Sequence, residues 1–226
     1  MHFLSDFMLE ILRFFYVVGG HNYGLAVIWL TIAINLALYP LTLSSIQAMS
    51  AMQRIQPRLQ DLQKKYKDEP QTMQKEMMEL YRSEGVSPLG GCLPVLLKIP
   101  FFLALFFALQ SKEFHALVSA SGAGAAFLWV ENLSKPEFLI LYGLRIPTFA
   151  MLIGITTYFM QKTMPSVQQG QMQIMTLFMP VFIAFISINF PAGVQLYWLV
   201  SNLMGAVQQY FIMRKQPRRP KTGGKK

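Results

Sequence analysis

Long apolar blocks alternate with polar segments along this chain, and five of the blocks approach the length of a membrane-spanning helix. They lie at residues 25–43, 93–109, 144–160, 174–190 and 194–213. At about 1.5 Å per residue the middle three reach only about 25 Å, short of the roughly 30 Å hydrocarbon core of a bilayer. Either these short spans thin the bilayer locally, or their bounds are a few residues too narrow. The pattern predicts an all-α polytopic membrane protein with a five-helix core.

The first twenty residues show the spacing of an amphipathic helix. One face collects the apolar residues Phe3, Leu4, Phe7, Met8, Ile11, Leu12 and Phe15. The opposite face carries Asp6, Glu10 and Arg13, which interrupt any apolar run long enough for a secretory signal peptide. We expect residues 1–20 to form an interfacial helix that either lies flat on the outer leaflet or caps the bundle.

Within the core domain, residues 21–213, the polar segment 47–88 predicts a cytoplasmic helical hairpin. Two narrow apolar stripes recur at helical spacing on either side of Asp68-Glu69-Pro70, a sequence suited to a turn and a helix start. The stripes are Ile55, Leu59, Leu62 and Tyr66, then Met73, Met77, Leu80 and Tyr81. The methionines either adapt the hairpin to varied apolar partners or fill gaps between its helices.

Composition and charge place the chain in a membrane and orient it. The 226 residues are 53% hydrophobic and 14% charged, with a net charge of +9. Basic residues concentrate in segment 47–88 and in the tail 214–226, so the positive-inside rule predicts an external N-terminus and a cytoplasmic C-terminus. The Pro- and Gly-containing tail is expected to be disordered. It either contacts ribosomal RNA or anionic lipids, or serves only to fix the topology.

The chain lacks the residue patterns of common enzymes. It has no zinc-protease His-Glu spacing and no phosphate-binding glycine loop, and its acidic residues lie outside the five blocks. His2, His21, Cys92 and His115 are too scattered to suggest a metal site. We therefore expect neither enzymatic activity nor a cofactor.

Several motifs then carry a family resemblance. In chain order they are YPLT at 39–42, EMMELY at 76–81, SPLGGCLP at 87–94, IPFFLAL at 99–105, FPAG at 190–193, LYW at 196–198, SN at 201–202 and QQ at 208–209. Together they closely resemble the YidC/Oxa/Alb family of membrane protein insertases, which implies a location in a bacterial plasma (inner) membrane. The resemblance implies that nascent transmembrane segments pass from the cytoplasm into the bilayer through a hydrophilic groove, without nucleotide hydrolysis. It also implies as partners nascent membrane proteins, the ribosome, the Sec translocon, the signal recognition particle with its receptor, and anionic lipids.

Groove residues are expected on three helices. In the first block, Thr31, Asn35, Thr42 and Ser45 share one helical face. The other expected wall residues are Thr157, Gln161, Ser201, Asn202 and Gln208. The alternative for such residues is hydrogen bonding to their own backbone or between helices.

A surface along which passenger helices slide is implied by the resemblance. Its residues would be Phe101, Phe102, Leu105, Phe106, Leu109, Tyr197 and Trp198. An interfacial aromatic belt explains Tyr197 and Trp198 equally well.

Asn35 departs from the family pattern. Many members carry a basic residue, usually Arg, where this chain has Asn35, so the groove is expected to be hydrated but less selective for acidic segments. Lys98 either restores part of this charge or extends to the membrane interface. The competing function for the same polar residues is a passive channel or small transporter.

Overall fold

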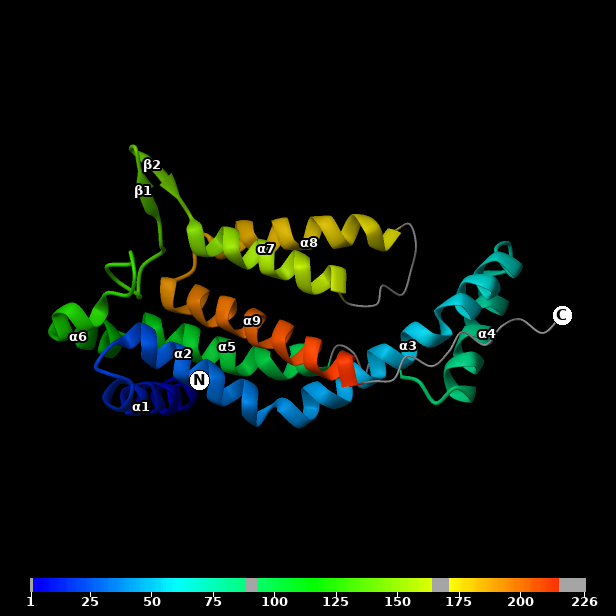
Figure 1. Cartoon of the computed structure of the whole chain (residues 1–226), viewed down its shortest axis with the longest axis horizontal. Helices are drawn as coiled ribbons and strands as arrows, with labels where there is room; N and C mark the ends of the chain where they lie inside the picture. Colours follow the sequence, from blue (N-terminus) through cyan, green and yellow to red (C-terminus); the bar gives the residue numbers. More distant parts are fainter. Residues whose placement is uncertain (1, 88–92, 164–170, 216–226) are drawn as a thin grey trace.

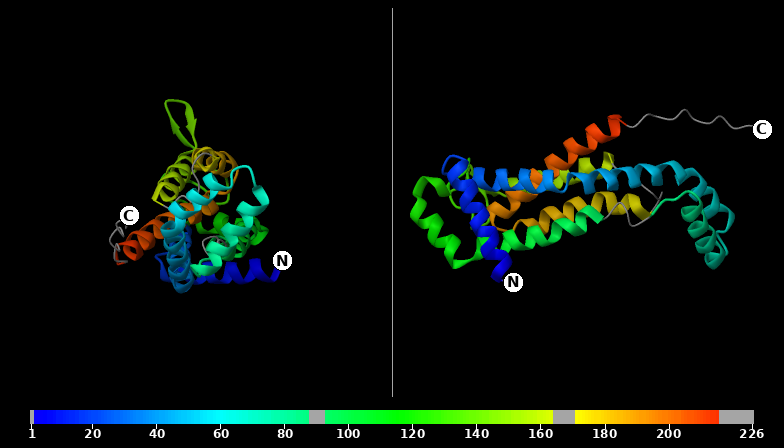
Figure 2. Two further views of the ribbon diagram at one scale, coloured as in Figure 1. Left: turned by 90° about the vertical axis from the view of Figure 1, so that its right-hand side faces the viewer. Right: turned by 90° about the horizontal axis from the view of Figure 1, so that it is seen from below.

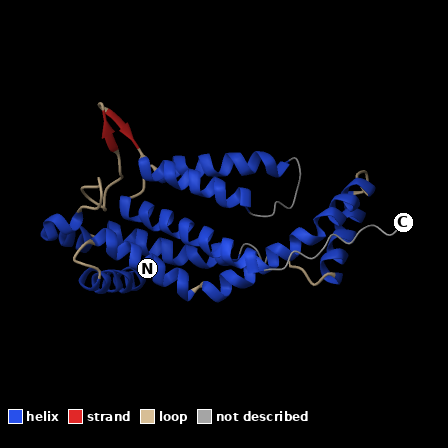
Figure 3. Cartoon of the chain, viewed as in Figure 1, coloured by secondary structure: helices blue, strands red, loops and turns tan. Residues whose placement is uncertain are grey.

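The computed structural model describes residues 2–87, 93–163 and 171–215, and these are mostly helical (Figure 1). The α-helices are α1 His2–Val18, α2 Tyr23–Ala37, α3 Tyr39–Lys65, α4 Pro70–Ser83, α5 Leu93–Gln110, α6 Lys112–Ser121, α7 Thr148–Thr163, α8 Gln171–Ser187 and α9 Ala192–Lys215. A 3-10 helix at Gly122–Ala125 and a hairpin of β1 Leu139–Leu141 and β2 Leu144–Ile146 complete the described elements. Figure 3 shows this hairpin in red against the helices.

Helices α2, α5, α7, α8 and α9 form an elongated bundle (Figures 1 and 2). Helix α7 packs against α8 and α9, while α9 also packs against α2 and α5. Leu105, Leu109, Phe114 and Phe149 are fully or almost fully buried in the core. The outer faces of α7 and α8 instead expose large apolar side chains, among them Phe159, Leu177 and Phe185. Such an extended exposed apolar surface is typical of a face that contacts something other than water.

Two of the predicted spans have different bounds in the structure. The first apolar block, 25–43, is divided at Leu38 between α2 and α3, and Pro40 stands in the first turn of α3. The third block was predicted to begin at Leu144, but Leu144–Ile146 is strand β2 and the helix begins at Thr148. Apolar content alone did not separate the strand from the helix, because short apolar runs suit both.

Length and apolar content give no single spanning helix among the described residues. Two bent helix pairs do meet both criteria. They are Ser5–Val18 with Tyr23–Ala37, bent by 113°, and Leu96–Gln110 with Lys112–Ala120, bent by 61°.

Helix α1 crosses one end of the bundle and packs on α2 and α5. Met8 and Leu12 of the expected apolar face are buried in the common core, together with Leu9, which was not assigned to that face. Phe7 and Phe14 remain exposed. The helix therefore covers the bundle with one side and presents apolar residues on another.

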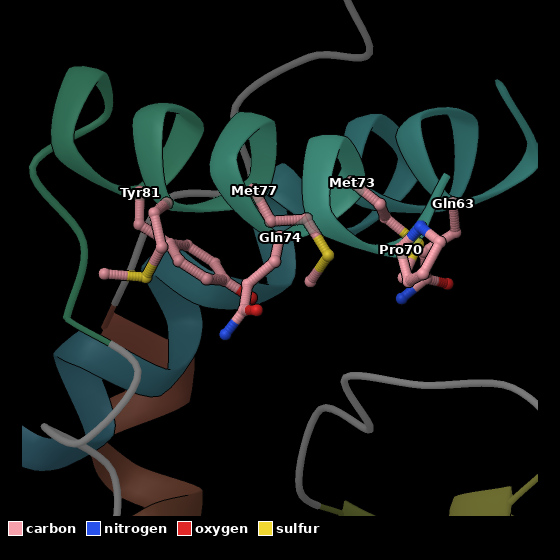
Figure 4. A pocket seen from close by; sticks show the side chains of 7 residues that line it. Gln63, Pro70, Met73, Gln74, Met77 and Tyr81 are labelled. Atoms are coloured by element: carbon pink, nitrogen blue, oxygen red, sulfur yellow. The ribbon is translucent and has the colours of Figure 1, made fainter. Parts of the chain in front are cut away.

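At the other end of the bundle, α3 and α4 form a projecting hairpin (Figure 1). Met52, Ile55 and Leu59 form a small separate core, against which Met77 and Tyr81 pack. A hollow of about 370 Å³ beside α4 is lined by Gln63, Pro70, Met73, Gln74, Met77, Met78 and Tyr81. Figure 4 shows these side chains from close by. The methionines thus fill space between the helices and also line an open hollow.

Buried polar contacts fix where α7 and α9 begin. The Glu137 carboxylate accepts hydrogen bonds from Phe149 N (2.9 Å) and Trp129 Nε1 (2.6 Å), which places an anion at the N-terminus of α7. Gln195 Nε2 donates to the carbonyls of Ser187 (2.6 Å) and Phe190 (3.1 Å), bridging the turn from α8 to α9. These contacts set the position of α9, which carries Ser201, Asn202 and Gln208 of the candidate site.

Candidate functional site

Asn35 is the centre of a polar cluster between α2, α5 and α9. Its side chain is only 1% exposed. The amide nitrogen Nδ2 donates to the Thr31 carbonyl (2.8 Å) and to Ser201 Oγ (3.3 Å), while Oδ1 accepts from Lys98 Nζ (2.9 Å). Both polar ends of one side chain are thereby used to connect three helices.

Gln208 extends this cluster one side chain further. Its Nε2 donates to the Asn35 carbonyl oxygen at 3.3 Å. Its own Oε1 is buried and has no hydrogen-bond partner in the described part of the protein, and the same is true of Gln209 Oε1. A buried acceptor without a partner is costly, so these oxygens are places where water or an incoming polar group would be stabilised.

Lys98 brings a positive charge to the cluster. Helices α2, α5, α7, α8 and α9 contain no Asp or Glu. The ion pairs of the described residues, Arg13–Glu10 and Arg58–Glu84, both involve other helices. The half-buried ammonium therefore meets an amide oxygen and no described carboxylate. An ammonium has three donors, so Lys98 keeps capacity for an anionic or polar ligand.

A second polar contact joins α9 to α7. Asn202 Nδ2 donates to Thr156 Oγ1 (3.1 Å) and Thr157 Oγ1 (3.0 Å). Ser201 and Asn202 are consecutive, and successive helical residues point about 100° apart, so they face different neighbours. The expected groove residues thus divide into two groups on different faces of α9.

The remaining expected groove residues make more local contacts. Thr31 Oγ1 donates to the Val27 carbonyl (2.6 Å), and Thr42 Oγ1 donates to that of Leu38 (3.1 Å). For these two hydroxyls the structure supports the alternative of bonding to their own helix. Ser45 is buried on α3, and Gln161 is half-buried near the end of α7.

The expected sliding surface is partly inside the protein. Phe102 contacts Phe190 and Trp198, with ring centroids 5.9 and 5.4 Å apart, in an aromatic cluster between α5 and α9. Phe101, Phe102, Phe106 and Trp198 are half-buried at the edge of the core.

Three residues of that expected surface require a correction. Leu105, Leu109 and Tyr197 are core residues, with 0, 0 and 3% of their surface exposed. They face other helices because they lie on the side of α5 or α9 that packs inward. The exposed side of α5 carries Leu96, Leu103 and Phe107 instead.

Sequence reasoning missed two sets of polar contacts, those of Thr156 and those of Gln195. Thr156 shares Asn202 with Thr157, and the adjacent pair of threonines in an apolar helix was the available signal. Gln195 was visible as a polar residue early in α9, but its bonds to two carbonyls of the preceding turn depend on the turn geometry. The described residues contain no group of three or more potential metal ligands.

Comparisons with known proteins identify the family of this chain. Residues 14–219 match the family model described as 60Kd inner membrane protein. The chain is 40% identical to the protein named membrane protein insertase YidC from Endomicrobium trichonymphae, over 94% of this chain and 40% of the relative. It is 39% identical to the protein of the same name from Geobacter sulfurreducens, over 93% of this chain and 37% of the relative.

A solved structure has a similar fold. It is described as an active YidC insertase crystal structure with the first transmembrane domain resolved. The TM-score is 0.70 at 25% identity, covering 90% of this chain and 45% of that one. The chain thus spans less than half the length of these relatives. The family match over most of its residues nevertheless confirms the resemblance drawn from the motifs: the chain belongs to the 60Kd inner membrane protein family, whose matching relatives here are bacterial proteins named YidC.

Proposed function

We propose that this chain is a membrane protein insertase, which moves nascent transmembrane segments from the cytoplasm into the lipid bilayer without nucleotide hydrolysis. The observation that carries the proposal is the contact of Lys98 and Ser201 with Asn35, buried between three helices that contain no acidic residue. Ionisable groups within a membrane bundle are costly and usually mark a pathway for a polar substrate.

The proposed mechanism needs only a lowered barrier. A polar segment of a passenger chain is expensive to place in hydrocarbon, by several kcal/mol for each unsatisfied group. A hydrated groove beside Asn35 and Gln208 offers hydrogen-bond partners at that depth and reduces the cost. Burial of the passenger's apolar helix in lipid supplies the net driving force.

The described conformation is the closed form of this groove in our proposal. Asn35 is almost fully buried, and its contacts to Ser201 and Gln208 are both long, at 3.3 Å. Separation of α9 from α2 by a small distance would break these two contacts and admit water to the Asn35 amide and to the unpaired Gln208 Oε1. Thr157, Gln161 and Asn202 would form the opposite wall, along α7.

Lys98 supplies the charge of the groove in the proposal. Asn35 is uncharged, and the Lys98 ammonium lies 2.9 Å from its side-chain oxygen. Of the two alternatives that the sequence left for Lys98, this contact favours the one in which Lys98 restores part of the charge missing at position 35. Acidic residues of a passenger segment would be attracted to it, because Coulomb attraction is strong where water is scarce.

The orientation and partners follow as parts of the same proposal. The α3–α4 hairpin lies in the cytoplasm with the C-terminus, and α1 lies at the outer face. The hairpin and the basic tail would meet the ribosome, the signal recognition particle and its receptor, and anionic lipids, and the bundle would work alone or beside the Sec translocon. Most of that tail, residues 216–226, lies outside the described residues.

Reconstitution tests the function directly. The full chain is placed in liposomes, and a purified single-span substrate with an acidic external segment is added. We expect the external segment to become protected from added protease, with no leak of ions. Solute flux without protection would instead indicate the passive channel. Absence of both protection and flux would also refute the proposal.

A further inference from the structure

The β1–β2 hairpin projects sideways from the bundle. Figure 1 shows it crossing the direction of the helix axes, at the end opposite the α3–α4 hairpin. The left view of Figure 2, along the long axis, shows it extending beyond the outline of the helices. None of its residues belongs to the hydrophobic core clusters of the described chain. The hairpin is therefore held at its base and uncovered along its length.

Its exposed surface is almost entirely apolar. The antiparallel register pairs Leu141 with Leu144 and Ile140 with Arg145. Leu141, Leu144 and Ile140 are 51, 65 and 70% exposed. Because side chains alternate between the faces of a strand, both faces of the hairpin present aliphatic groups.

The tip carries a fully exposed tyrosine in a disfavoured backbone conformation. Tyr142 has φ +50° and Gly143 has φ +79°, so both central residues of the two-residue turn are left-handed. Asn or Asp followed by Gly is the usual sequence for such a turn. Tyrosine gains nothing there from contacts within the chain, and its aromatic body with a polar hydroxyl suits a membrane–water interface.

Neither water nor the hydrocarbon core is a suitable surrounding for this element. An isolated two-stranded hairpin is at best marginally stable in water. In the hydrocarbon core, the unpaired N–H and C=O groups on its outer edges would have no partners. The interfacial layer of a bilayer receives apolar side chains while water and headgroups satisfy the backbone. Arg145, stacked 4.6 Å from the centre of the Phe138 ring, adds a cation that suits lipid phosphate.

The surface next to the hairpin, at the start of α7, is also apolar and exposed. Helix α7 begins at Thr148, two residues after β2 ends, and exposes Met151 and Ile155 in its first two turns. We propose that the β1–β2 hairpin is a membrane anchor, which lies in the interfacial layer of the outer leaflet and takes the lipid surface as its partner. The proposal goes beyond the insertase activity and rests only on the proposed orientation of the bundle in the membrane.

Fluorescence quenching in liposomes tests the anchor. Tyr142→Cys in a Cys92→Ser background is labelled with an environment-sensitive fluorophore, and the full chain is reconstituted in phosphatidylethanolamine–phosphatidylglycerol vesicles. We expect strong quenching by lipids spin-labelled near the headgroup, weaker quenching by lipids labelled deep in the chain, and little by aqueous iodide. Met78→Cys on the exposed face of α4, at the opposite end of the protein, is the matched control and should be quenched by iodide alone.

The aliphatic residues are tested in the same format. Leu141→Ser with Leu144→Ser should reduce lipid quenching of the position-142 label and restore iodide quenching. Iodide quenching without lipid quenching in the unsubstituted hairpin would overturn the anchor, and so would protection from both quenchers, which would indicate a protein partner. Flotation of the vesicles and substrate protection are measured on the same samples. A floating, active protein with a water-exposed tip refutes only the anchor, whereas failure to float refutes the proposed membrane bundle as well.

Discussion

Lys98 Nζ lies 2.9 Å from Asn35 Oδ1 and joins two helices through residues 63 positions apart in the chain. The contact orients the Asn35 amide, so that its nitrogen faces Thr31 and Ser201. It also determines where the charge of the cluster resides. The ammonium belongs to α5, while α2 contributes a neutral group that holds it. The first prediction concerns the placement of the charge on α5 and of the amide on α2.

We expect the charge to be transferable between the two positions. Lys98→Gln should reduce insertion of a substrate with an acidic external segment more than insertion of a matched neutral one, because the attraction of the ammonium is lost. Adding Asn35→Arg to Lys98→Gln should restore much of the preference, since the double variant again has one cation and one amide. Insertion efficiency of the two substrates in liposomes measures both effects.

Lys162→Gln is the control for loss of a lysine from the bundle. Lys162 is exposed at the end of α7, and its Nζ lies 6.0 Å from the centre of the Tyr158 ring. It should leave the charge preference unchanged. If Lys98→Gln lowers insertion of both substrates equally, Lys98 is a structural residue and the charge argument fails.

The contact of Asn202 with Thr156 and Thr157 predicts a measurable tie between α9 and α7. Asn202→Ala removes both donated hydrogen bonds, and interhelical hydrogen bonds of this kind contribute about 0.6 kcal/mol on average in membrane proteins. We expect the free energy of unfolding in detergent to fall by roughly 1 kcal/mol. In a double-mutant cycle with Thr157→Val, the double variant should lose less stability than the sum of the losses in the two single variants. Full additivity would mean that the two side chains do not interact.

Sequence patterning located the long elements because their apolar residues repeat over many turns. Bundle helices α5 and α9 lie close to the predicted blocks, and α4 begins at the predicted Pro70. The β1–β2 hairpin was missed because three-residue strands give too short a pattern, and its apolar residues extend the following helical block. The sequence also did not predict that Asn202 and Ser201 contact different helices, because the partner of each helical face is known only once the neighbouring helices are placed.

Within the site, polar residue type predicted which side chains would meet better than helical spacing did. Asn35, Ser201 and Gln208 were expected together and do meet. Thr42 was expected beside them, yet it lies beyond the break at Leu38 and bonds to the carbonyl of that residue. The break moves the face of α3 relative to that of α2, and a helical repeat counted through residue 38 takes no account of it.

Gly24 permits a close approach that a larger residue would prevent. A Cβ at this position would lie 2.2 Å from Phe127 Cγ and 2.5 Å from Phe127 Cβ. Gly24→Ala should therefore shift the loop and lower stability by roughly 1–3 kcal/mol, measured by unfolding in detergent. Phe127→Gly removes both the ring and the Cβ that the new methyl would meet, so the double variant should be destabilised less than the two single losses added together. A fully additive double variant would show that the loop does not rest on α2.

The last prediction concerns water at the polar cluster. Ser201 is 7% exposed and next to Asn35, so in a Cys92→Ser background a Ser201→Cys thiol should react slowly with small water-soluble thiol reagents in the resting protein. Binding of a stalled nascent chain should increase the rate, because the proposed opening separates α9 from α2 at this point. Val27→Cys, in the fully buried core of α2, should stay unreactive in both states, and Met78→Cys should react quickly in both. If Ser201→Cys remains as unreactive as Val27→Cys with the passenger engaged, water does not reach the cluster, and a polar segment crossing beside Asn35 would have no favourable partner during its passage.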